Sequence, residues 1–409
     1  MSKLQHDRLQ RVVVKDNALQ IAGRKASELT SIAGGTPCYV YDRAALSQRA
    51  RELRAVMPGQ LKLHYAIKAN PMPALVAHMA GLVDGLDVAS HKEMLVALGS
   101  GVHAADISFA GPAKGVNELR AAVAADIVIN VESPLELERL YELQEEMGAR
   151  PRVAFRVNPD FELKSSGMKM AGGPKQFGID AEDMPDILRN LDTERVNFQG
   201  FHIFSGSQNL KPEALIEAHD KTFELAARLA EVAPAAVKHV NIGGGLGIPY
   251  FPGEKALDVK PVAENLQRLL LSLPVSLEKT DFIMELGRYL VGEAGYYLCR
   301  VTDKKVSRGQ AFLMTDGGLH HHLSNSGNFG QVIRKNYPVL LANRVEGGER
   351  EKVEIVGPLC TPLDIVGAKL ELPVAEVGDF VAVLQSGAYG ATASPQDFLS
   401  HPHVRELLI

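Results

Sequence analysis

Leu61-Lys62-Leu63-His64-Tyr65-Ala66-Ile67-Lys68-Ala69-Asn70-Pro71 is the most informative segment of this chain of 409 residues. Apolar residues stand at every second position from Leu61 to Ile67, an alternation typical of a short β-strand. Pro71 marks the turn that follows, because proline cannot donate a hydrogen bond to a sheet. The segment therefore predicts a strand with a lysine, Lys68, at its carboxyl end.

The same unit, a short apolar run followed by an amphipathic helix, recurs along the chain. The predicted strands are residues 61–67, 85–89, 107–110, 127–131, 153–157, 198–205, 239–242 and 282–286. The predicted helices are residues 74–81, 91–98, 116–125, 135–147, 184–190, 214–232 and 261–273. Such an alternation predicts a (β/α)8 barrel, with an open doubly wound sheet as the alternative.

The positions of polar residues favour the barrel. In a barrel the carboxyl ends of all strands converge on one face, where active sites lie. Polar side chains and glycines follow the predicted strands, namely Lys68, Asp87, Arg156, His202, Gly243, Gly244, Gly245 and Glu285. We therefore predict an α/β protein built on a TIM barrel.

A second pattern begins near Gly295, where apolar residues recur with period two between glycine turns. It predicts strands at 297–301, 311–315, 352–356 and 380–384. Residues 11–14 and 38–41 form similar runs, which we expect to join these strands. The predicted organisation is N-terminal strands in 1–44, the barrel in 45–285 and a C-terminal β-rich domain in 286–409.

Composition excludes several classes of protein. The chain is 46% hydrophobic and 23% charged, as globular proteins are. A net charge of −5 without a basic run argues against nucleic acid and membranes as partners. The first residues lack the apolar core of a signal peptide, and three scattered cysteines fit no disulfide framework. We therefore expect a cytoplasmic protein.

Lys68 is a candidate nucleophile. In a partly apolar pocket the pKa of its ammonium falls, so the neutral amine can attack an aldehyde; a solvated surface lysine is the alternative.

Two glycine-rich turns, 243–247 and 387–390, offer backbone N–H groups to a phosphate, with a plain tight turn as the alternative. Glu285 stands where it can keep a pyridine nitrogen protonated, or it forms an ion pair with Arg288.

Taken together, a set of motifs makes nearly the whole chain resemble the fold-type III pyridoxal phosphate decarboxylases, which include diaminopimelate and ornithine decarboxylases. The motifs occupy residues 65–70, 87–90, 156–159, 176–179, 202–208, 243–245, 285–288, 357–360 and 387–390. The resemblance implies a TIM barrel that binds pyridoxal 5′-phosphate and a second, β-rich domain.

The resemblance also implies roles for individual residues. Lys68 bonds to the cofactor aldehyde, His202 stacks on the ring and Glu285 pairs with the ring nitrogen. Further cofactor-binding residues are Asp87, Arg156, Ser205, Gly243, Gly244, Gly245, Gly287, Arg288 and Tyr389. Cys360 and Asp364 come from the other subunit of a homodimer, and Cys360 protonates the carbanion after CO2 leaves. A small buried apolar role is the alternative for Cys360.

Two loops depart from diaminopimelate decarboxylase, which usually has a Cys-Glu-Ser-Gly loop and an Arg-Pro pair that reads the distal carboxylate. Here they read Cys360-Thr361-Pro362-Leu363-Asp364 and Leu319-His320-His321-His322-Leu323. Losing those partners disfavours free meso-diaminopimelate as the substrate. With the 168–174 insertion and residues 397–403, the loops resemble the exosortase-A-associated and siderophore-type branch. Relatives in this branch act on modified, conjugated or carrier-bound amino acids, but the resemblance does not supply the substrate of the exosortase-A-associated decarboxylases.

We expect substrate contacts from Arg288, His320, His321, Thr361 and Asp364, with the histidines lining the substrate entrance. Consecutive histidines point in different directions, so we predict no metal site. The predicted activity is removal of the α-carboxylate of an amino acid or amino-acid conjugate as CO2, leaving an amine.

Three alternatives to this prediction remain. The first is diaminopimelate decarboxylase, which makes L-lysine. The second is a non-catalytic pyridoxal phosphate-binding or regulatory homologue, which the presence of Lys68, His202, Glu285 and Cys360 disfavours. The third is a racemase or a cofactor carrier on the same barrel. Single-domain carriers lack a β domain, and racemases resembling this chain would need a tyrosine base where Cys360 stands.

Overall fold

A computed structural model describes residues 5–161, 168–169, 173–331 and 333–409. The 168–174 insertion therefore lies partly outside the described residues, although Met168–Lys169 (β10) pairs with Gly206–Ser207 (β13). The chain divides into two compact units. The first comprises Met1–Leu46, Pro249–Ala256 and Val291–Ile409, and the second comprises Ser47–Ile248 and Leu257–Leu290.

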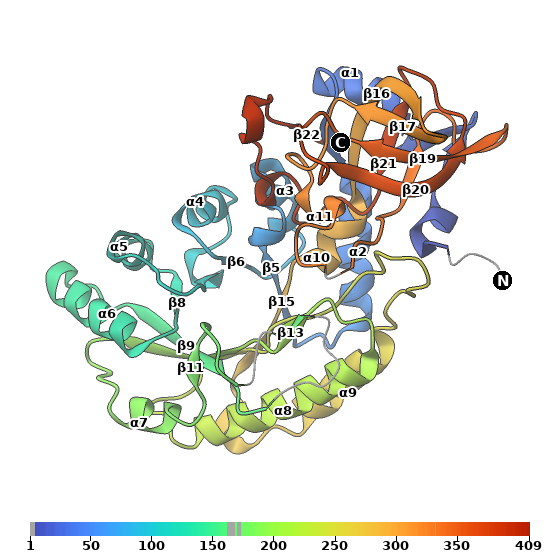
Figure 1. The fold of residues 1–409 in the computed structure, drawn as a ribbon. Coiled ribbons are helices and arrows are strands. Elements are labelled where there is room, and N and C mark those ends of the chain that lie inside the picture. Colours follow the sequence, from blue (N-terminus) through green and yellow to red (C-terminus); the bar gives the residue numbers. More distant parts are fainter. Residues whose placement is uncertain (1–4, 162–167, 170–172, 332) are drawn as a thin grey trace. The chain divides into compact units, whose positions relative to one another are not determined.

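Parallel strands form a closed barrel in the second unit (Figure 1). In spatial order they are β5 (Lys62–Ala66), β6 (Gly85–Val88), β7 (Ile107–Phe109), β8 (Val128–Val131), β9 (Arg152–Asn158), β12 (Asn197–Ile203), β14 (His239–Asn241) and β15 (Asp281–Leu286). β15 pairs with β5, placing Glu285 opposite His64, and this pairing closes the ring. The TIM barrel is confirmed, and the doubly wound sheet is excluded.

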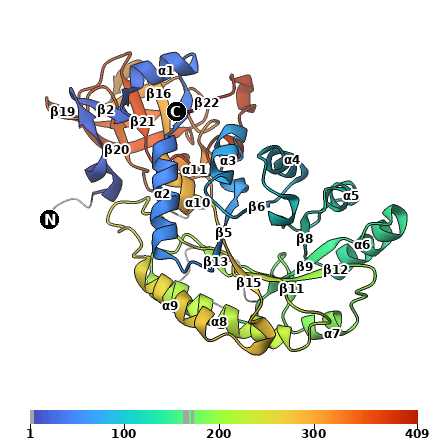
Figure 2. The same cartoon turned by 180° about the vertical axis from the view of Figure 1, so that it is seen from behind.

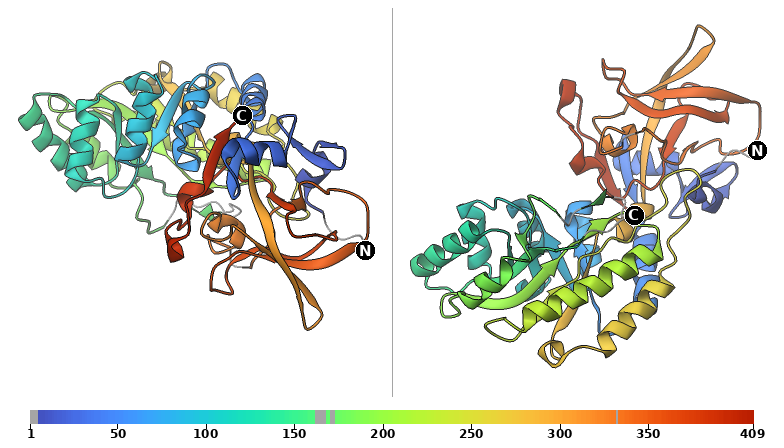
Figure 3. Two further views of the ribbon diagram at one scale, coloured as in Figure 1. Left: turned by 90° about the horizontal axis from the view of Figure 1, so that it is seen from above. Right: turned by 60° about the horizontal axis from the view of Figure 1, so that its bottom comes forward.

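A helix follows nearly every barrel strand, close to the predicted positions. These helices are α3 (Pro73–Ala80), α4 (His91–Gly99), α5 (Val116–Ala124), α6 (Pro134–Met147), α7 (Met184–Arg189), α8 (Pro212–Ala230) and α9 (Lys260–Leu271). α8 buries residues such as Leu215, Ala218 and Leu229 on one face, which gives it the apolar stripe that packs on a sheet. Figure 2 and Figure 3 show α8 and α9 side by side.

The barrel interior holds a partly polar cavity that reaches the predicted site residue Asp87. A cavity of about 170 Å³ is lined by residues from most of the strands, among them His64, Asp87, Ser108, Asn130 and His239. Barrel interiors are usually filled by branched apolar side chains. The polar part of this lining includes Asp87 and its partners Ser108 and His64.

The first unit contains the β-rich part of the chain. One sheet runs β18 (Val339–Leu341), β21 (Phe380–Val383), β16 (Gly295–Ser307), β17 (Gln310–Thr315), β19 (Arg350–Val356) and β20 (Ile365–Pro373). β4 (Cys38–Tyr41) pairs with β16 and with β22 (Arg405–Leu408). Buried apolar side chains such as Cys38, Val40, Leu298 and Ala382 form the core behind it.

The strand expected at 11–14 is wrong. Asp7–Arg11 forms a short 3-10 helix (η1), and the strand β1 is confined to Val14–Lys15. An ion pair between Arg11 and Asp7, four residues apart, favours the helical turn. β1 continues into a small sheet with β2 (Ala18–Ile21) and β3 (Arg24–Lys25). The helices α1 (Ala26–Ala33) and α2 (Arg43–Val56) were not predicted.

Within the described residues, no helix is both long and apolar enough to cross a membrane.

Candidate active site

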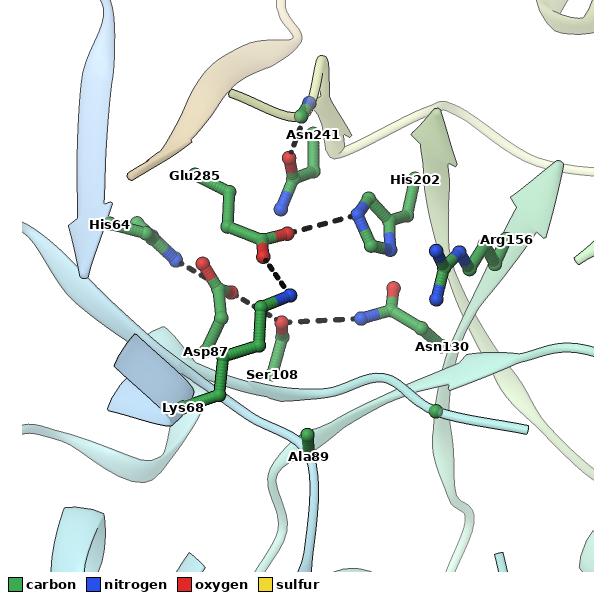
Figure 4. Close-up of polar contacts among 12 residues, drawn as sticks. His64, Lys68, Asp87, Ala89, Ser108, Asn130, Arg156, His202, Asn241 and Glu285 are labelled. Carbon is green, nitrogen blue, oxygen red and sulfur yellow. Dashed lines mark hydrogen bonds and ion pairs between the residues drawn. The ribbon is translucent and has the colours of Figure 1, made fainter. Parts of the chain in front are cut away.

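A lysine, a glutamate and a histidine meet at the carboxyl ends of the barrel strands. Lys68 lies in the turn η2 (Ile67–Ala69) directly after β5, His202 lies in β12, and Glu285 lies in β15. Lys68 Nζ is 3.1 Å from Glu285 Oε1, and His202 Nε2 is 3.1 Å from Glu285 Oε2. Figure 4 shows the carboxylate between the amine and the imidazole.

The electrostatics of this group keep Glu285 ionised. Burial by itself raises the pKa of the Glu285 carboxyl, but Lys68 and His202 outweigh it and hold that pKa below its usual range. The Lys68 side chain is 44% exposed, so its amine faces the barrel mouth while still contacting Glu285. His202 is 2% exposed, and its Nδ1 has no hydrogen-bond partner among the described residues.

Asp87 sits in a buried hydrogen-bonded chain beside these residues. The amide nitrogen of Asn130 donates to Ser108 Oγ at 3.2 Å, and that hydroxyl donates to Asp87 Oδ1 at 2.6 Å. The same Asp87 oxygen lies 3.2 Å from His64 Nδ1. Asp87 Oδ2 is buried and has no partner among the described residues. The chain fixes the Asp87 carboxylate within the barrel (Figure 4).

The glycine turn after β14 is held in a conformation that suits glycine. Gly243 has φ of 71° and donates its backbone N–H to Asn241 Oδ1 at 2.8 Å. A Cβ on Gly244 would lie 1.9 Å from the carbonyl oxygen of Glu285. The N–H groups of Gly244 and Gly245 have no hydrogen-bond partner among the described residues. The turn therefore packs tightly on β15 and leaves two donors available.

Other predicted cofactor-binding residues of the barrel lie near strand ends. Arg156, in β9, donates from Nη1 to Glu132 at 3.0 Å. Ser205 follows β12 and is half-buried. Gly287 packs close to Ala66 and Ala69, where a Cβ would lie 2.9 Å from Ala69. Arg288 begins the short helix α10 (Arg288–Val291) and is half-buried.

In the first unit, Cys360 lies on an exposed loop that Asp364 holds in shape. Cys360 is exposed and Thr361 half-buried, whereas Asp364 is 2% exposed. Asp364 Oδ1 accepts the backbone N–H of Leu319 at 2.6 Å, and Oδ2 accepts that of Leu359 at 2.8 Å. Burial raises the pKa of Asp364, although both N–H groups oppose the shift. The carboxylate thus joins the Cys360 loop to the histidine segment.

The three consecutive histidines are buried, and two of them have different hydrogen-bond partners. His321 Nε2 lies 2.8 Å from the carbonyl oxygen of Pro402, and His322 Nε2 lies 2.9 Å from Ser386 Oγ. Neither ring nitrogen of His320 has a partner among the described residues. Burial lowers the pKa of His320 and of His322 to about 3, so both rings are neutral.

Tyr389, the remaining predicted phosphate ligand, lies in the turn after β21 and has φ of 52°. Its carbonyl oxygen accepts the hydroxyl of Ser324 at 2.8 Å. A Cβ on neighbouring Gly387 would lie 1.8 Å from the carbonyl oxygen of Val291, so this turn too depends on glycine.

Sequence reasoning missed several residues that shape the barrel site. They are Ser108, Asn130, Glu132 and Asn241. Asn130 and Glu132 stand two residues apart at the end of β8, so strand alternation places them on one face. That spacing was the available signal for both.

Comparison with known proteins gives consistent matches. Residues 43–292 match the family model described as pyridoxal-dependent decarboxylase, pyridoxal binding domain. The chain is 37% identical to the L-glutamyl-[BtrI acyl-carrier protein] decarboxylase of Niallia circulans, covering 91% of this chain and 88% of that protein. It is 30% identical to the 2-[(L-alanin-3-ylcarbamoyl)methyl]-2-hydroxybutanedioate decarboxylase of Staphylococcus aureus, covering 89% and 92%.

Among solved structures, the diaminopimelate decarboxylase of Methanocaldococcus jannaschii superposes with a TM-score of 0.88 at 30% sequence identity. The match covers 98% of this chain and 93% of that one. The similarity therefore extends over both units of the chain.

Proposed function

Because the chain belongs to the pyridoxal-dependent decarboxylases, we propose that it removes the α-carboxylate of an amino acid whose distal end is conjugated or bound to a carrier. The chain is a carboxy-lyase, and its cofactor is pyridoxal 5′-phosphate. When bound, this cofactor accepts the electron pair that the departing carboxylate leaves behind.

The residues present in the barrel fit this cofactor. The amine of Lys68 faces the barrel mouth, where it can bond to an aldehyde. Glu285 is ionised and buried, as an acceptor for a protonated ring nitrogen must be. The unpartnered N–H groups of Gly244 and Gly245 suit phosphate oxygens. Arg288, Ser205, Gly243, Gly287 and Tyr389 complete the proposed cofactor ligands.

We assign the remaining roles as follows. His202 places its imidazole against the cofactor, and its Nε2 lies 3.1 Å from Glu285 Oε2, a contact that helps to hold that carboxylate in position. Asp87 and Arg156 support the site through their buried hydrogen bonds. After CO2 leaves, the Cys360 thiol gives its proton to the substrate Cα, so the product carries a hydrogen where the carboxylate was.

The observation that carries the substrate proposal is the absence of a cation from the segment after Asp316. Residues 317–326 contain no lysine or arginine, and His320 and His322 are neutral. A free distal carboxylate would find no lysine or arginine within this segment to replace its hydration, which costs binding energy. His320, with two unpartnered ring nitrogens, suits a neutral amide or thioester instead. His321, Arg288, Thr361 and Asp364 are the other proposed substrate residues.

We further propose a homodimer with shared active sites. Cys360 lies on an exposed loop, as a residue that reaches a partner's site would. Leu363 is 56% exposed and Phe329 is 47% exposed. Asn328 donates to the carbonyl oxygen of Leu363 at 3.4 Å, so the two apolar side chains flank one surface. Such a surface next to an exposed thiol supports a subunit contact.

A cytoplasmic location is also proposed. All three cysteines of the chain are free, which suits a reducing compartment.

The decisive experiment measures CO2 release from a substrate panel. The panel contains γ-glutamyl thioester of N-acetylcysteamine, meso-diaminopimelate, L-lysine, L-ornithine, L-arginine and L-glutamate, with Lys68→Ala as the blank. We expect kcat/KM for the thioester to exceed that for free L-glutamate about 100-fold or more, because the free carboxylate remains unpaired.

Brisk release from meso-diaminopimelate with none from the thioester would contradict the conjugate proposal. It would instead establish the second candidate, diaminopimelate decarboxylase, which the similarity to the archaeal structure favours.

A further inference from the structure

Glu132, which no sequence motif singled out, joins three loops at the barrel mouth. It follows β8 directly, and its side chain is 3% exposed. Its Oε1 lies 3.0 Å from Arg156 Nη1 and also accepts the backbone N–H of Gly111, which follows β7. Its Oε2 accepts the N–H of Gly178, in the loop after β9, at 3.2 Å. One carboxylate thereby fixes the ends of neighbouring strands.

The charge of Glu132 belongs to a buried, balanced set. Glu136 Oε2 accepts the backbone N–H of Glu132 at 2.8 Å, and Glu136 Oε1 lies 2.6 Å from Lys114 Nζ. The side chains of Lys114 and Glu136 are 2% and 5% exposed. The carboxylates of Glu132 and Glu136 and the cations of Arg156 and Lys114 therefore compensate one another out of water. Removing any one of them would leave an uncompensated buried charge, which is strongly destabilising.

Arg156 is constrained on two sides by this arrangement. Its guanidinium lies over the ring of Phe177, 4.9 Å from the centroid, and bonds to Glu132. Figure 4 shows the guanidinium directed towards His202 and Asn130. An arginine without a carboxylate partner at this place would be drawn towards Glu285, because charge-assisted pairs of arginine and carboxylate are strong.

We propose that Glu132 is a positioning residue of this decarboxylase, which fixes Arg156 beside the cofactor site and cancels its charge there. Arg156 can then donate hydrogen bonds at the site without competing with Lys68 and His202 for Glu285. The proposal rests on the assignment of Lys68 and Glu285 to the cofactor site. It does not depend on which amino acid is the substrate.

The test is a pH titration of the visible absorbance of the holoenzyme. Glu132→Gln keeps the size of the side chain but leaves the positive charge of Arg156 uncompensated. That charge disfavours protonation of the nearby Lys68 nitrogen. We therefore expect the apparent pKa of the absorbance change to fall by about one unit relative to the wild type. Arg156→Gln leaves the negative charge of Glu132 instead and is expected to raise it. The double variant Glu132→Gln/Arg156→Gln should titrate like the wild type.

A matched control is Glu146→Gln, which removes an exposed glutamate paired with Arg120 and should leave the titration unchanged. If Glu132→Gln does not fold, the opposite shift expected for Arg156→Gln still tests the idea. Wild-type titration in both single variants, or the same shift in the single and double variants, would overturn it. The titration does not require CO2 release. A failure of the substrate proposal can therefore be distinguished from a failure of the proposed role of Glu132.

Discussion

Lys68 Nζ lies 3.1 Å from Glu285 Oε1, although the two residues are 217 positions apart in the chain. The closure of the barrel explains this, since β15 pairs with β5 and brings the ends of both strands together. The other carboxylate oxygen contacts His202. Glu285 therefore joins the proposed nucleophile to the proposed ring-stacking residue.

Replacing Glu285 with glutamine should remove most of the activity. The amide keeps the shape of the side chain but cannot carry the negative charge that Lys68 and His202 stabilise. We expect kcat to fall about 100-fold or more at saturating cofactor, as for other preorganised electrostatic groups. Steady-state CO2 release measures this, with Glu146→Gln as the surface control. A kcat within a few-fold of the wild type would mean that Glu285 has no part in the chemistry.

The same glycine substitution should act in opposite directions at two positions. A Cβ on Gly244 would lie 1.9 Å from the backbone oxygen of Glu285, which cannot move without breaking the barrel. Gly244→Ala should therefore cost about 3 kcal/mol or more and weaken cofactor binding. Gly99, at the end of α4, has open space around it, so Gly99→Ala should be neutral or stabilising. The measurements are thermal unfolding and cofactor titration of both variants. An equal response of the two variants would contradict this account.

A buried histidine should make stability depend on pH. His219 in α8 is 2% exposed, and burial lowers its pKa to about 4. The unfolded chain binds a proton near the usual pKa of about 6.5, so stability falls as pH drops from about 6.5 to about 4. Above that range the contribution is fully present.

The measurement is the thermal midpoint of the holoenzyme at pH 7.5 and pH 5. His219→Gln should reduce the difference between the two midpoints, because glutamine does not titrate. The matched control is His103→Gln, at an exposed histidine outside the long helices. An unchanged pH difference in His219→Gln would show that other groups govern acid sensitivity.

The sequence predicted the barrel and the residues at its strand ends, since both follow from local periodicity. Lys68, His202 and Glu285 each stand where a strand ends, and parallel pairing brings such positions together. The partners of Glu132 could not be predicted in this way. They depend on loop geometry at Gly111 and Gly178, which lie in different connections and have positive φ.

The hydrogen-bond partners of the three consecutive histidines could not be predicted from the sequence either. The sequence shows three adjacent imidazoles but not which of them already has a partner. Contacts with Pro402 and Ser386, each more than 60 residues away, distinguish His321 and His322 from His320. Such long-range pairing is set by the sheet and its loops, not by local pattern.

Mixing two inactive variants should restore activity if the site is shared between subunits. Lys68→Ala lacks the amine of the barrel, and Cys360→Ala lacks the thiol of the exposed loop. In a mixed dimer one site carries both substitutions, and the other carries neither. Random exchange gives mixed dimers in half of the molecules, so about a quarter of the wild-type CO2 release is expected. Mixing each variant with itself is the control. If sedimentation shows that subunits exchange but activity does not return, Cys360 acts within its own chain, and the exposed surface around Leu363 needs another explanation.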